Sequence, residues 1–352
     1  MTRSDASRVL RLHAAAANLS DHVEPWSRTS DLRSRLSAAP FLMAPMAGVS
    51  DAAYRTMARS GGAALAYTEM VSVAGMHYGS LKTWELVDPC DAEPDIAVQL
   101  FGRDVGQFRE AVIGVQERLR DRLALIDVNM ACPVPKVTRK GEGSALLADP
   151  DQAAAIIRAC TEEADVPVTC KIRLGLTSDA IVAPEFASRM EDAGASAVAV
   201  HGRTRSQLYH GASDRSAIAE VVSAVGIPVI ASGDAMDEKA CVDILHETGA
   251  AAVFVARGSY GDPWVFSRAL DRLSGREVVP PTTADRLGAF ECHVRLLDAT
   301  GGRMARARSL AGWYLKGLPR AGAMRDAAMR CLTLDDYLDL LDGIRSSLEG
   351  DL

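Results

Sequence analysis

The sequence lacks the features of a membrane or secreted protein. No apolar run approaches the roughly 20 residues that a helix needs to cross a bilayer. Residues 1–36 are interrupted by charges and serines, unlike a signal peptide. The seven cysteines are scattered without a C-x-x-C pair, which indicates neither a zinc site nor a disulfide framework. We therefore expect a cytoplasmic protein with no metal site.

Positive charge is also scarce over the chain as a whole. The formal net charge is −7, which argues mildly against a nucleic-acid partner because phosphate contacts need lysine and arginine. A whole-chain sum does not describe a local patch, however. Residues 301–330 hold seven cations and one acid. On composition alone, such a run is typical of a solvated helix face.

Apolar runs that alternate with helical segments make up most of the 352 residues. Eight runs are typical of strands buried on both faces, at 41–47, 64–71, 96–101, 124–130, 167–174, 197–201, 227–231 and 251–256. Helical spacing lies between them, for example over 149–164, 184–193 and 238–248. Eight such units over roughly 230 residues predict an α/β fold of the (β/α)8 barrel type. The alternative, a doubly wound open sheet, requires a glycine-rich first turn that residues 44–48 lack.

The pattern changes after residue 273. Residues 274–281 are typical of a linker, and only helical periodicity follows, over 286–299, 304–316, 320–331 and 334–348. Thr283 and Thr333 are candidate N-caps of the first and last of these helices. We therefore predict an N-terminal extension (1–38) with one amphipathic helix over 7–18, a barrel (39–275) and a small helical bundle (281–352).

Residues 127–133 form the most informative stretch. An apolar strand ends in Asn129 and Cys132, and Pro133 stops it. Barrel enzymes keep their reactive groups just past the C-terminal ends of strands. A lone cysteine is often a buried structural thiol. Alternatively, a thiol with an ordinary pKa of about 8.5 is protonated at neutral pH and can donate a proton, or it can attack as the thiolate. We favour the acid over the nucleophile.

Two cations share one face of the predicted fifth strand. Lys171 and Arg173 point to the barrel lumen, whereas Ile172 points to the helices, because side chains alternate along a strand. Cations buried in a lumen need an anionic partner. A reduced flavin, negatively charged near N1 and O2, would supply one. An internal salt bridge with Asp127, which also faces inward, is the alternative.

The last two predicted strands end in small residues, Ser232-Gly233-Asp234 and Ala256-Arg257-Gly258. Such turns let backbone N–H groups approach a phosphate, and barrels commonly place a phosphate site there. The pair therefore predicts a phosphorylated ligand such as FMN. His201 closes the sixth strand beside small alanines, so it contacts a cofactor or is satisfied by local backbone. Gln99 in the third strand bonds a flavin edge or a neighbouring strand.

Eight short motifs lie in order along the chain, at residues 44–51, 129–133, 139–140, 143–147, 171–173, 201–205, 230–234 and 313–315. They read Ala-Pro-Met-Ala-Gly-Val-Ser-Asp, Asn-Met-Ala-Cys-Pro, Arg-Lys, Gly-Ser-Ala-Leu-Leu, Lys-Ile-Arg, His-Gly-Arg-Thr-Arg, Ile-Ala-Ser-Gly-Asp and Trp-Tyr-Leu. Their order and spacing resemble those of the tRNA-dihydrouridine synthases, the B subgroup most closely, from about residue 41 to the C-terminal helices. Residues 1–38 have no clear counterpart.

The resemblance implies a flavin enzyme that reduces the C5=C6 bond of uridine in the D-loop of tRNA to 5,6-dihydrouridine. NADPH would reduce FMN, which would pass hydride to C6, and Cys132 matches the proton donor to C5. The FMN-contacting positions are Pro45, Met46, Ala47, Gln99, Lys171, His201, Ser232, Gly233, Asp234, Ala256 and Arg257. Asn129 and Arg173 match substrate or flavin contacts. Implied RNA contacts are Lys136, Arg139 and Lys140 after the cysteine, and Arg306 and Lys316 in the helical part.

Three residues depart from the family's usual pattern: Ser232 stands for Asn, and Ala131 and Ala256 stand for Gly. None of these changes removes a reacting group. Three other functions remain open: an FMN barrel reductase of a free small molecule, as in dihydroorotate dehydrogenase-like proteins, an RNA-binding protein without catalysis, and the same reduction on ribosomal RNA. The basic helical segment argues against the first, and Cys132 with Lys171 argues against the second.

Overall fold

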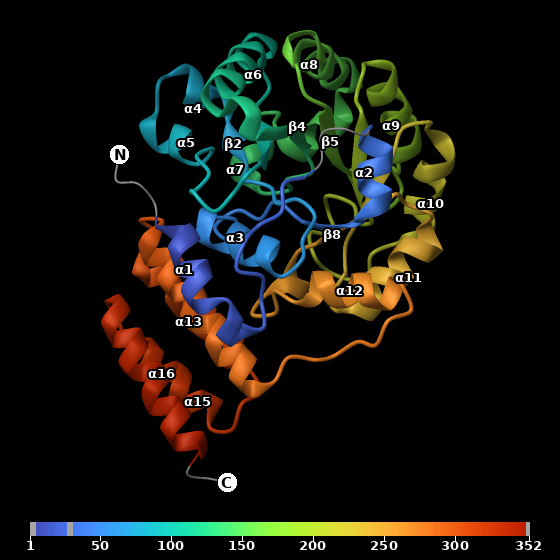
Figure 1. Ribbon diagram of the computed structural model, residues 1–352. Helices are drawn as coiled ribbons and strands as arrows, with labels where there is room; N and C mark the ends of the chain where they lie inside the picture. Colours follow the sequence, from blue (N-terminus) through green and yellow to red (C-terminus); the bar gives the residue numbers. More distant parts are fainter. Residues whose placement is uncertain (1–4, 27–30, 350–352) are drawn as a thin grey trace.

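The computed structural model describes residues 5–26 and 31–349 and builds them around one parallel sheet. Its strands are β1 (Phe41–Met43), β2 (Val71–Ser72), β3 (Ile96–Phe101), β4 (Leu123–Met130), β5 (Val168–Arg173), β6 (Ala197–His201), β7 (Val229–Ser232) and β8 (Ala252–Val255). The order is β1-β8-β7-β6-β5-β4-β3-β2. Figure 1 shows the strands curling around a common axis with helices outside them.

Residues 64–68 close the sheet into a barrel. The N–H of Ala64 bonds the carbonyl of Phe41 at 3.0 Å, and on the other side the N–H of Thr68 bonds the carbonyl of Ala97 at 2.9 Å. The predicted (β/α)8 fold is thus confirmed. The predicted second strand differs from the structure: residues 64–68 form only isolated bridges, at Ala66 and Tyr67, and regular pairing with β3 is confined to Val71–Ser72.

Side chains alternate between two cores along each strand, as parallel barrel strands require. On β6, Val198 and Val200 pack against the helices, whereas Ala197 and Ala199 fill the lumen. On β5, Ile172 lies in the outer core, as predicted. The lumen core therefore combines small side chains from β6 with larger ones such as Tyr67 and Phe254, whose rings are in contact.

The outer layer consists of the helices that connect the strands (Figure 1). They are α3 (Ala52–Ser60), α4 (Val73–His77), α5 (Leu81–Glu85), α6 (Val105–Leu119), α7 (Pro135–Thr138), α8 (Pro150–Glu163), α9 (Ala183–Asp192), α10 (Arg215–Ala224), α11 (Glu238–Thr248) and α12 (Val265–Leu273). Asp149 caps α8 as predicted, since its carboxylate accepts the N–H of Gln152. Helix α11 has the predicted bounds and ends at Gly249, whose φ of 67° lies in the left-handed region.

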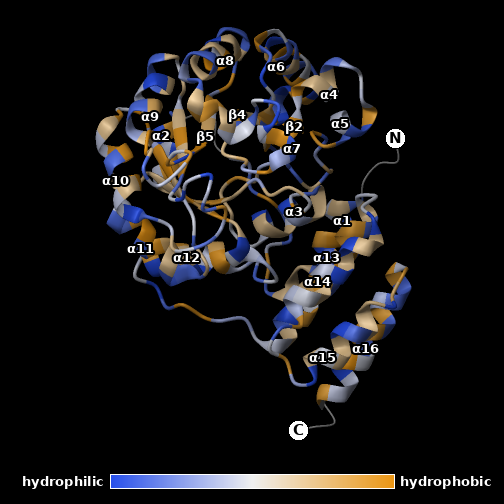
Figure 2. Ribbon diagram, turned by 180° about the vertical axis from the view of Figure 1, so that it is seen from behind, coloured by the Kyte–Doolittle hydropathy of each residue, from blue (hydrophilic) through white to orange (hydrophobic). Residues whose placement is uncertain are grey.

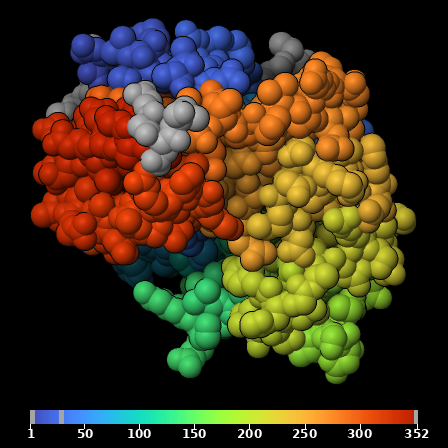
Figure 3. Space-filling view, turned by 90° about the horizontal axis from the view of Figure 1, so that it is seen from below, coloured from blue at the N-terminus to red at the C-terminus, as the bar shows by residue number. Residues whose placement is uncertain are grey.

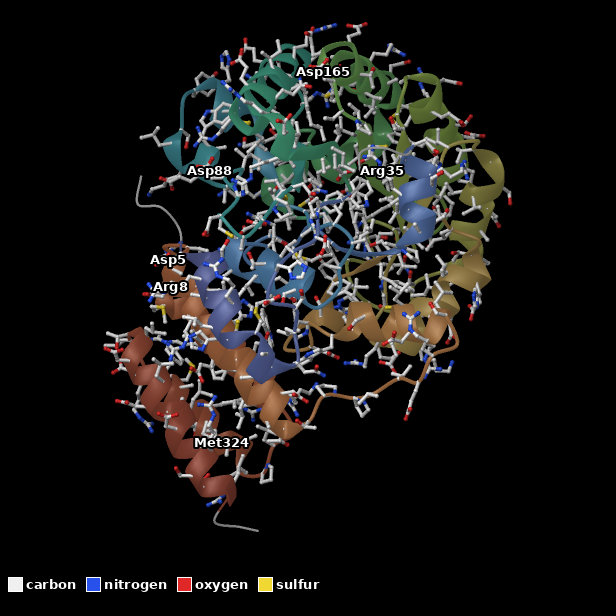
Figure 4. All side chains as sticks on the ribbon, in the orientation of Figure 1. Asp5, Arg8, Arg35, Asp88, Asp165 and Met324 are labelled. Atoms are coloured by element: carbon white, nitrogen blue, oxygen red, sulfur yellow. The ribbon has the colours of Figure 1, made fainter. Side chains whose placement is uncertain are left out.

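The N-terminal segment packs against two parts of the protein, the C-terminal helices and the barrel. Helix α1 (Ala6–His13) and a 3₁₀ turn (Ala15–Ala17) lie along α13 (Thr283–Ala299; Figure 1). The contact is close, since a Cβ on Gly288 of α13 would stand 2.2 Å from the carbonyl oxygen of Ala16. Helix α2 (Leu32–Ala38) places Leu32 and Leu36 in the lumen core. Figure 4, which labels Arg35, shows α2 in front of the strands. Helix α2 therefore covers the end of the barrel opposite the strand C-termini.

Four helices follow the barrel, as predicted: α13 (Thr283–Ala299), α14 (Ala307–Tyr314), α15 (Ala321–Ala328) and α16 (Leu334–Glu349). With α1 they form a second apolar core, and Figure 2 shows hydrophilic and hydrophobic residues interspersed along these helices. The predicted cap Thr283 is wrong by one residue, because Thr282 forms a capping box with Asp285. Thr333 accepts the N–H of Asp336 at 3.2 Å, which confirms the other cap. The division into domains at 39–275 and 281–352 stays a prediction.

Within residues 5–26 and 31–349, no helix combines the length and apolar character that crossing a bilayer requires.

Candidate active site

Most of the predicted cofactor residues gather at the end of the barrel where the strands have their C-termini. The register pairs Gln99 with Asp127 and Asn129 with Lys171, and it pairs His201 with both Arg173 and Ser232. Residues 45–47, 132 and 256 directly follow β1, β4 and β8. Because all the strands are parallel, these groups surround one opening, which we call the mouth.

Lys171 is a buried cation without a partner. Its side chain stands in the lumen with only 8% of the residue exposed, and burial, with Arg173 beside it, lowers the pKa of its ammonium to about 8. In the part of the chain that the structure describes, the ammonium makes no hydrogen bond or ion pair. The alternative salt bridge is not formed, because Asp127 accepts from Gln99 and Thr169 instead.

A line of buried polar side chains runs from Asp127 to the cysteine loop. The Thr169 hydroxyl and the Gln99 Nε2 donate to the Asp127 carboxylate at 2.6 and 2.7 Å. Asn129 Nδ2 donates to Gln99 Oε1 at 2.8 Å. Asn129 Oδ1 accepts the N–H of Cys132 at 2.9 Å. Gln99 and Asn129 therefore bond each other and their neighbours, and each amide nitrogen keeps one further hydrogen.

Cys132 lies half-buried at the mouth, and the other six cysteines are buried. Burial raises the pKa of its thiol, against the opposing effects of the Val134 backbone and the cations Arg173 and Lys171. The hydroxyl and N–H of Ser144 both bond the Cys132 carbonyl, at 2.9 and 3.0 Å, and fix the loop. The thiol is therefore protonated at neutral pH, as an acid must be.

Arg173 holds the loops of the mouth together. Its Nε donates to the carbonyl of Ala131 at 2.9 Å, and its Nη1 donates to the carbonyls of Thr204 and Leu208 at 2.8 Å each. Its guanidinium carbon also lies 5.6 Å from the centre of the Tyr209 ring. The guanidinium thus donates mainly to backbone carbonyls, which indicates that its role is to position the loops of the mouth.

His201 is neutral and faces several cations. Burial, followed by Lys171, Arg173, Arg203 and Arg257, lowers its pKa to about 2. Nη1 of Arg203 lies 3.3 Å from Nε2 of the ring. A guanidinium can only donate, so Nε2 accepts and Nδ1 carries the proton. His201 therefore offers a donor to a ligand.

The ends of β7 and β8 form one corner, as predicted. A Cβ on Gly258 would lie 2.3 Å from the Ala235 carbonyl, so the two turns touch through backbone. Asp234 binds Arg203 at 2.7 and 2.9 Å and Arg257 at 3.3 Å. Among the described residues, the N–H groups of Asp234 and Ala235 have no hydrogen-bond partner. Unsatisfied N–H groups beside an arginine suit an anion.

The predicted RNA contacts fall into two groups. Lys136, Arg139 and Lys140 are exposed on the segment after β4, which projects at the lower edge of Figure 3 in green, and Lys316 is exposed on the helical part. Arg306 instead binds Asp51 and Glu69, the latter at 3.0 Å. Its guanidinium joins the helical part to the loops after β1 and before β2.

Two important residues were not predicted. Arg203 lies inside the quoted motif 201–205, which marked its region but not its role. Tyr209 is 61% exposed above the mouth, flanked by the guanidiniums of Arg173 and Arg257. It follows no strand directly and belongs to no motif, so only the fold reveals it.

Comparison with known proteins agrees with this geometry. Residues 42–348 match the family model described as Dihydrouridine synthase (Dus). The chain is 36% identical to "Probable tRNA-dihydrouridine synthase 1" of Synechocystis, over 90% of this chain and 89% of that protein. It is 38% identical to "tRNA-dihydrouridine synthase B" of Escherichia coli, over 81% of this chain and 88% of that protein.

Among solved structures, histamine dehydrogenase from Rhizobium superposes with a TM-score of 0.50. The match covers 73% of this chain and 49% of that chain, at 12% identity. At this identity the similarity concerns the fold alone.

Proposed function

This chain belongs to the dihydrouridine synthase family, and we propose that it reduces the C5=C6 bond of a uridine in the D-loop of tRNA, with FMN as cofactor and NADPH as reductant. The observation that carries the proposal is the joint presence, at one barrel mouth, of a protonated thiol at Cys132 and an unpartnered ammonium at Lys171. A cytoplasmic location follows from the same proposal.

The residues at the mouth fit FMN. The lone ammonium of Lys171 suits the pyrimidine edge of a flavin, which becomes anionic on reduction. His201 Nδ1 and the free amide hydrogen of Gln99 are further donors for that edge. Arg257, with the unsatisfied N–H groups of Asp234 and Ala235, would hold the phosphate. The loop at residues 45–47, after β1, lies next to the end of β8, because β1 pairs with β8.

FMN, when bound, supplies the hydride that adds to C6 of the uracil. Hydride addition at C6 makes C5 basic, because C5 is conjugated to the C4 carbonyl. Cys132 holds the proton for C5, since its raised pKa keeps the thiol protonated at neutral pH. Asn129 is placed to orient the ring, and Arg173 keeps the surrounding loops in place.

The exposed cations support the proposal that the substrate uridine is part of an RNA. Lys136, Arg139 and Lys140 are exposed on the segment that follows Cys132, and Lys316 is exposed on the helical part. Together they offer phosphate contacts at the mouth and beside it, although the whole chain is acidic. A uridine must leave its stack to reach the mouth, and unpairing costs least in a loop.

The test of this function is dihydrouridine formation by the purified protein with FMN and NADPH. We expect dihydrouridine in unmodified tRNA transcripts and none in free uracil, orotate or ribosomal RNA. Mass spectrometry of nuclease fragments then locates the modified uridine. Reduction of free pyrimidines alone would instead indicate a small-molecule reductase, and binding of tRNA by a colourless protein would indicate a catalytically inactive binder.

Replacing Lys316 by alanine should weaken tRNA binding in a salt-dependent way. An exposed cation that contacts one phosphate releases about one counterion, so the slope of log K against log salt should fall by about 1. Arg306→Ala is the matched comparison, because the Arg306 guanidinium is occupied by Asp51 and Glu69. Filter binding between 50 and 300 mM salt measures both; equal slopes for wild type and Lys316→Ala would remove Lys316 from the interface.

A further inference from the structure

We propose that Asp127 is a positioning residue that orients the amide groups of Gln99 and Asn129 and, through them, the loop that carries Cys132. The inference deepens the proposed function, on which its catalytic readout rests. Asp127 makes no hydrogen bond to the cysteine loop or to Lys171, so its effect on Cys132 would pass through Gln99 and Asn129. Its charge also acts on Lys171, and Asp127→Asn and Asp127→Leu both remove that charge.

The two ends of the hydrogen-bond line fix its direction. At one end a backbone N–H, that of Cys132, can only donate, so the Asn129 atom facing it is the oxygen. At the other end the Asp127 carboxylate can only accept while it is ionised, so the Gln99 atom facing it is the nitrogen. The Gln99 oxygen must then face the Asn129 nitrogen, at 2.8 Å. Both ends therefore require the same orientations: backbone N–H donors of the cysteine loop set the Asn129 amide, and the buried carboxylate holds the Gln99 amide in the orientation that matches it.

This orientation decides what the mouth offers to a ligand. Asn129 Oδ1 accepts two backbone N–H groups and Gln99 Oε1 accepts from Asn129, so the remaining amide hydrogens of both side chains are donors for a ligand. Lys171 and the Nδ1–H of His201 add donors at the mouth. A surface of donors complements the carbonyl oxygens of a uracil or flavin ring. Without the carboxylate, Gln99 can turn over and present its oxygen to the ligand and its nitrogen to Asn129, which costs a buried hydrogen bond.

The experiment compares Asp127→Leu with Asp127→Asn. Asparagine can still accept from Gln99 with its oxygen and donate to the Thr169 hydroxyl with its nitrogen, whereas leucine can do neither. Alkylation of Cys132 by iodoacetamide, followed by peptide mass spectrometry, reads the loop directly without FMN or RNA, because the other cysteines are buried. We expect Asp127→Leu to speed alkylation at least about threefold and Asp127→Asn to stay close to wild type.

Dihydrouridine formation is the second readout, with a loss of about tenfold or more in kcat for Asp127→Leu and recovery of most of it in Asp127→Asn. Thr169→Val is the matched control, because it removes the other bond to Asp127 and leaves the line to Cys132 intact. If Asp127→Leu does not fold, Gln99→Met provides a second test, because it removes the hydrogen bond between Gln99 and Asn129. It should speed alkylation of Cys132 to a similar degree.

Equal alkylation rates for Asp127→Leu, Asp127→Asn and wild type would overturn the proposal. If the wild-type protein does not reduce tRNA but the variants show the expected alkylation pattern, the proposed function is wrong and the role of Asp127 stands.

Discussion

Replacing Cys132 by alanine should lower the rate of dihydrouridine formation about 100-fold or more and leave the affinity for FMN within about twofold of wild type. The thiol is the one half-exposed cysteine of the chain, and burial raises its pKa, so it is protonated when a carbanion-like C5 needs a proton. Water can replace it only slowly in a mouth lined by protein. Single-turnover reduction of tRNA, with FMN binding measured by fluorescence, separates the two effects.

Cys331→Ala is the control for this change. That cysteine is also free, but it lies in the C-terminal helical core, so its loss should not alter the rate of reduction. Since the thiol must be protonated to act, the rate of C5 protonation should fall as the pH rises through the raised pKa of Cys132. Wild-type rates in Cys132→Ala would refute the acid role, and a covalent adduct with the uridine would reassign the thiol as a nucleophile.

Local sequence patterns were sufficient to predict features that depend on a single helix or strand. The alternation on β5 and β6 predicted which side chains face the lumen, and α11 follows the predicted bounds because Gly249 ends it. The thiol and the ammonium were found for the same reason. Lys171 lies within β5 and Cys132 follows β4, and the alternation or apolar run of each strand is visible in its own sequence.

Long-range partners could not be predicted in this way. Residues 64–68 close the barrel only because β1 and β3 lie on either side of them. Arg306 belonged to a basic run and so indicated RNA contact, yet its partner Asp51 lies 255 residues away. Asp127 was considered as a partner of Lys171, but two neutral donors, Gln99 and Thr169, reach it instead. The sequence states which charges exist, and the fold decides which of them meet.

Replacing Lys171 by methionine should stabilise the flavin-free protein by about 3 kcal/mol at pH 7. Burial lowers the pKa of this ammonium from 10.5 to about 8, so holding it charged costs folding free energy. The cost is fully present below about pH 8, shrinks as the pH rises, and is absent above about pH 10.5. The gain of the methionine variant should therefore be smaller at pH 9.5 than at pH 7. Denaturant unfolding at the two pH values measures it.

The same substitution should weaken FMN binding and slow reduction of the flavin, the two functions that we assign to the buried charge. An anionic flavin edge would restore a partner to Lys171, so FMN should stabilise wild type and do little for Lys171→Met, which reverses their order of stability. Reduction of bound FMN by NADPH should slow about 10-fold or more, because no cation then offsets the developing charge. Lys82→Met, at an exposed lysine on α5, should change stability by less than about 0.5 kcal/mol. A Lys171→Met protein that is less stable without flavin, or that is reduced as fast as wild type, would show that the ammonium has a partner within the chain and is not kept for the cofactor.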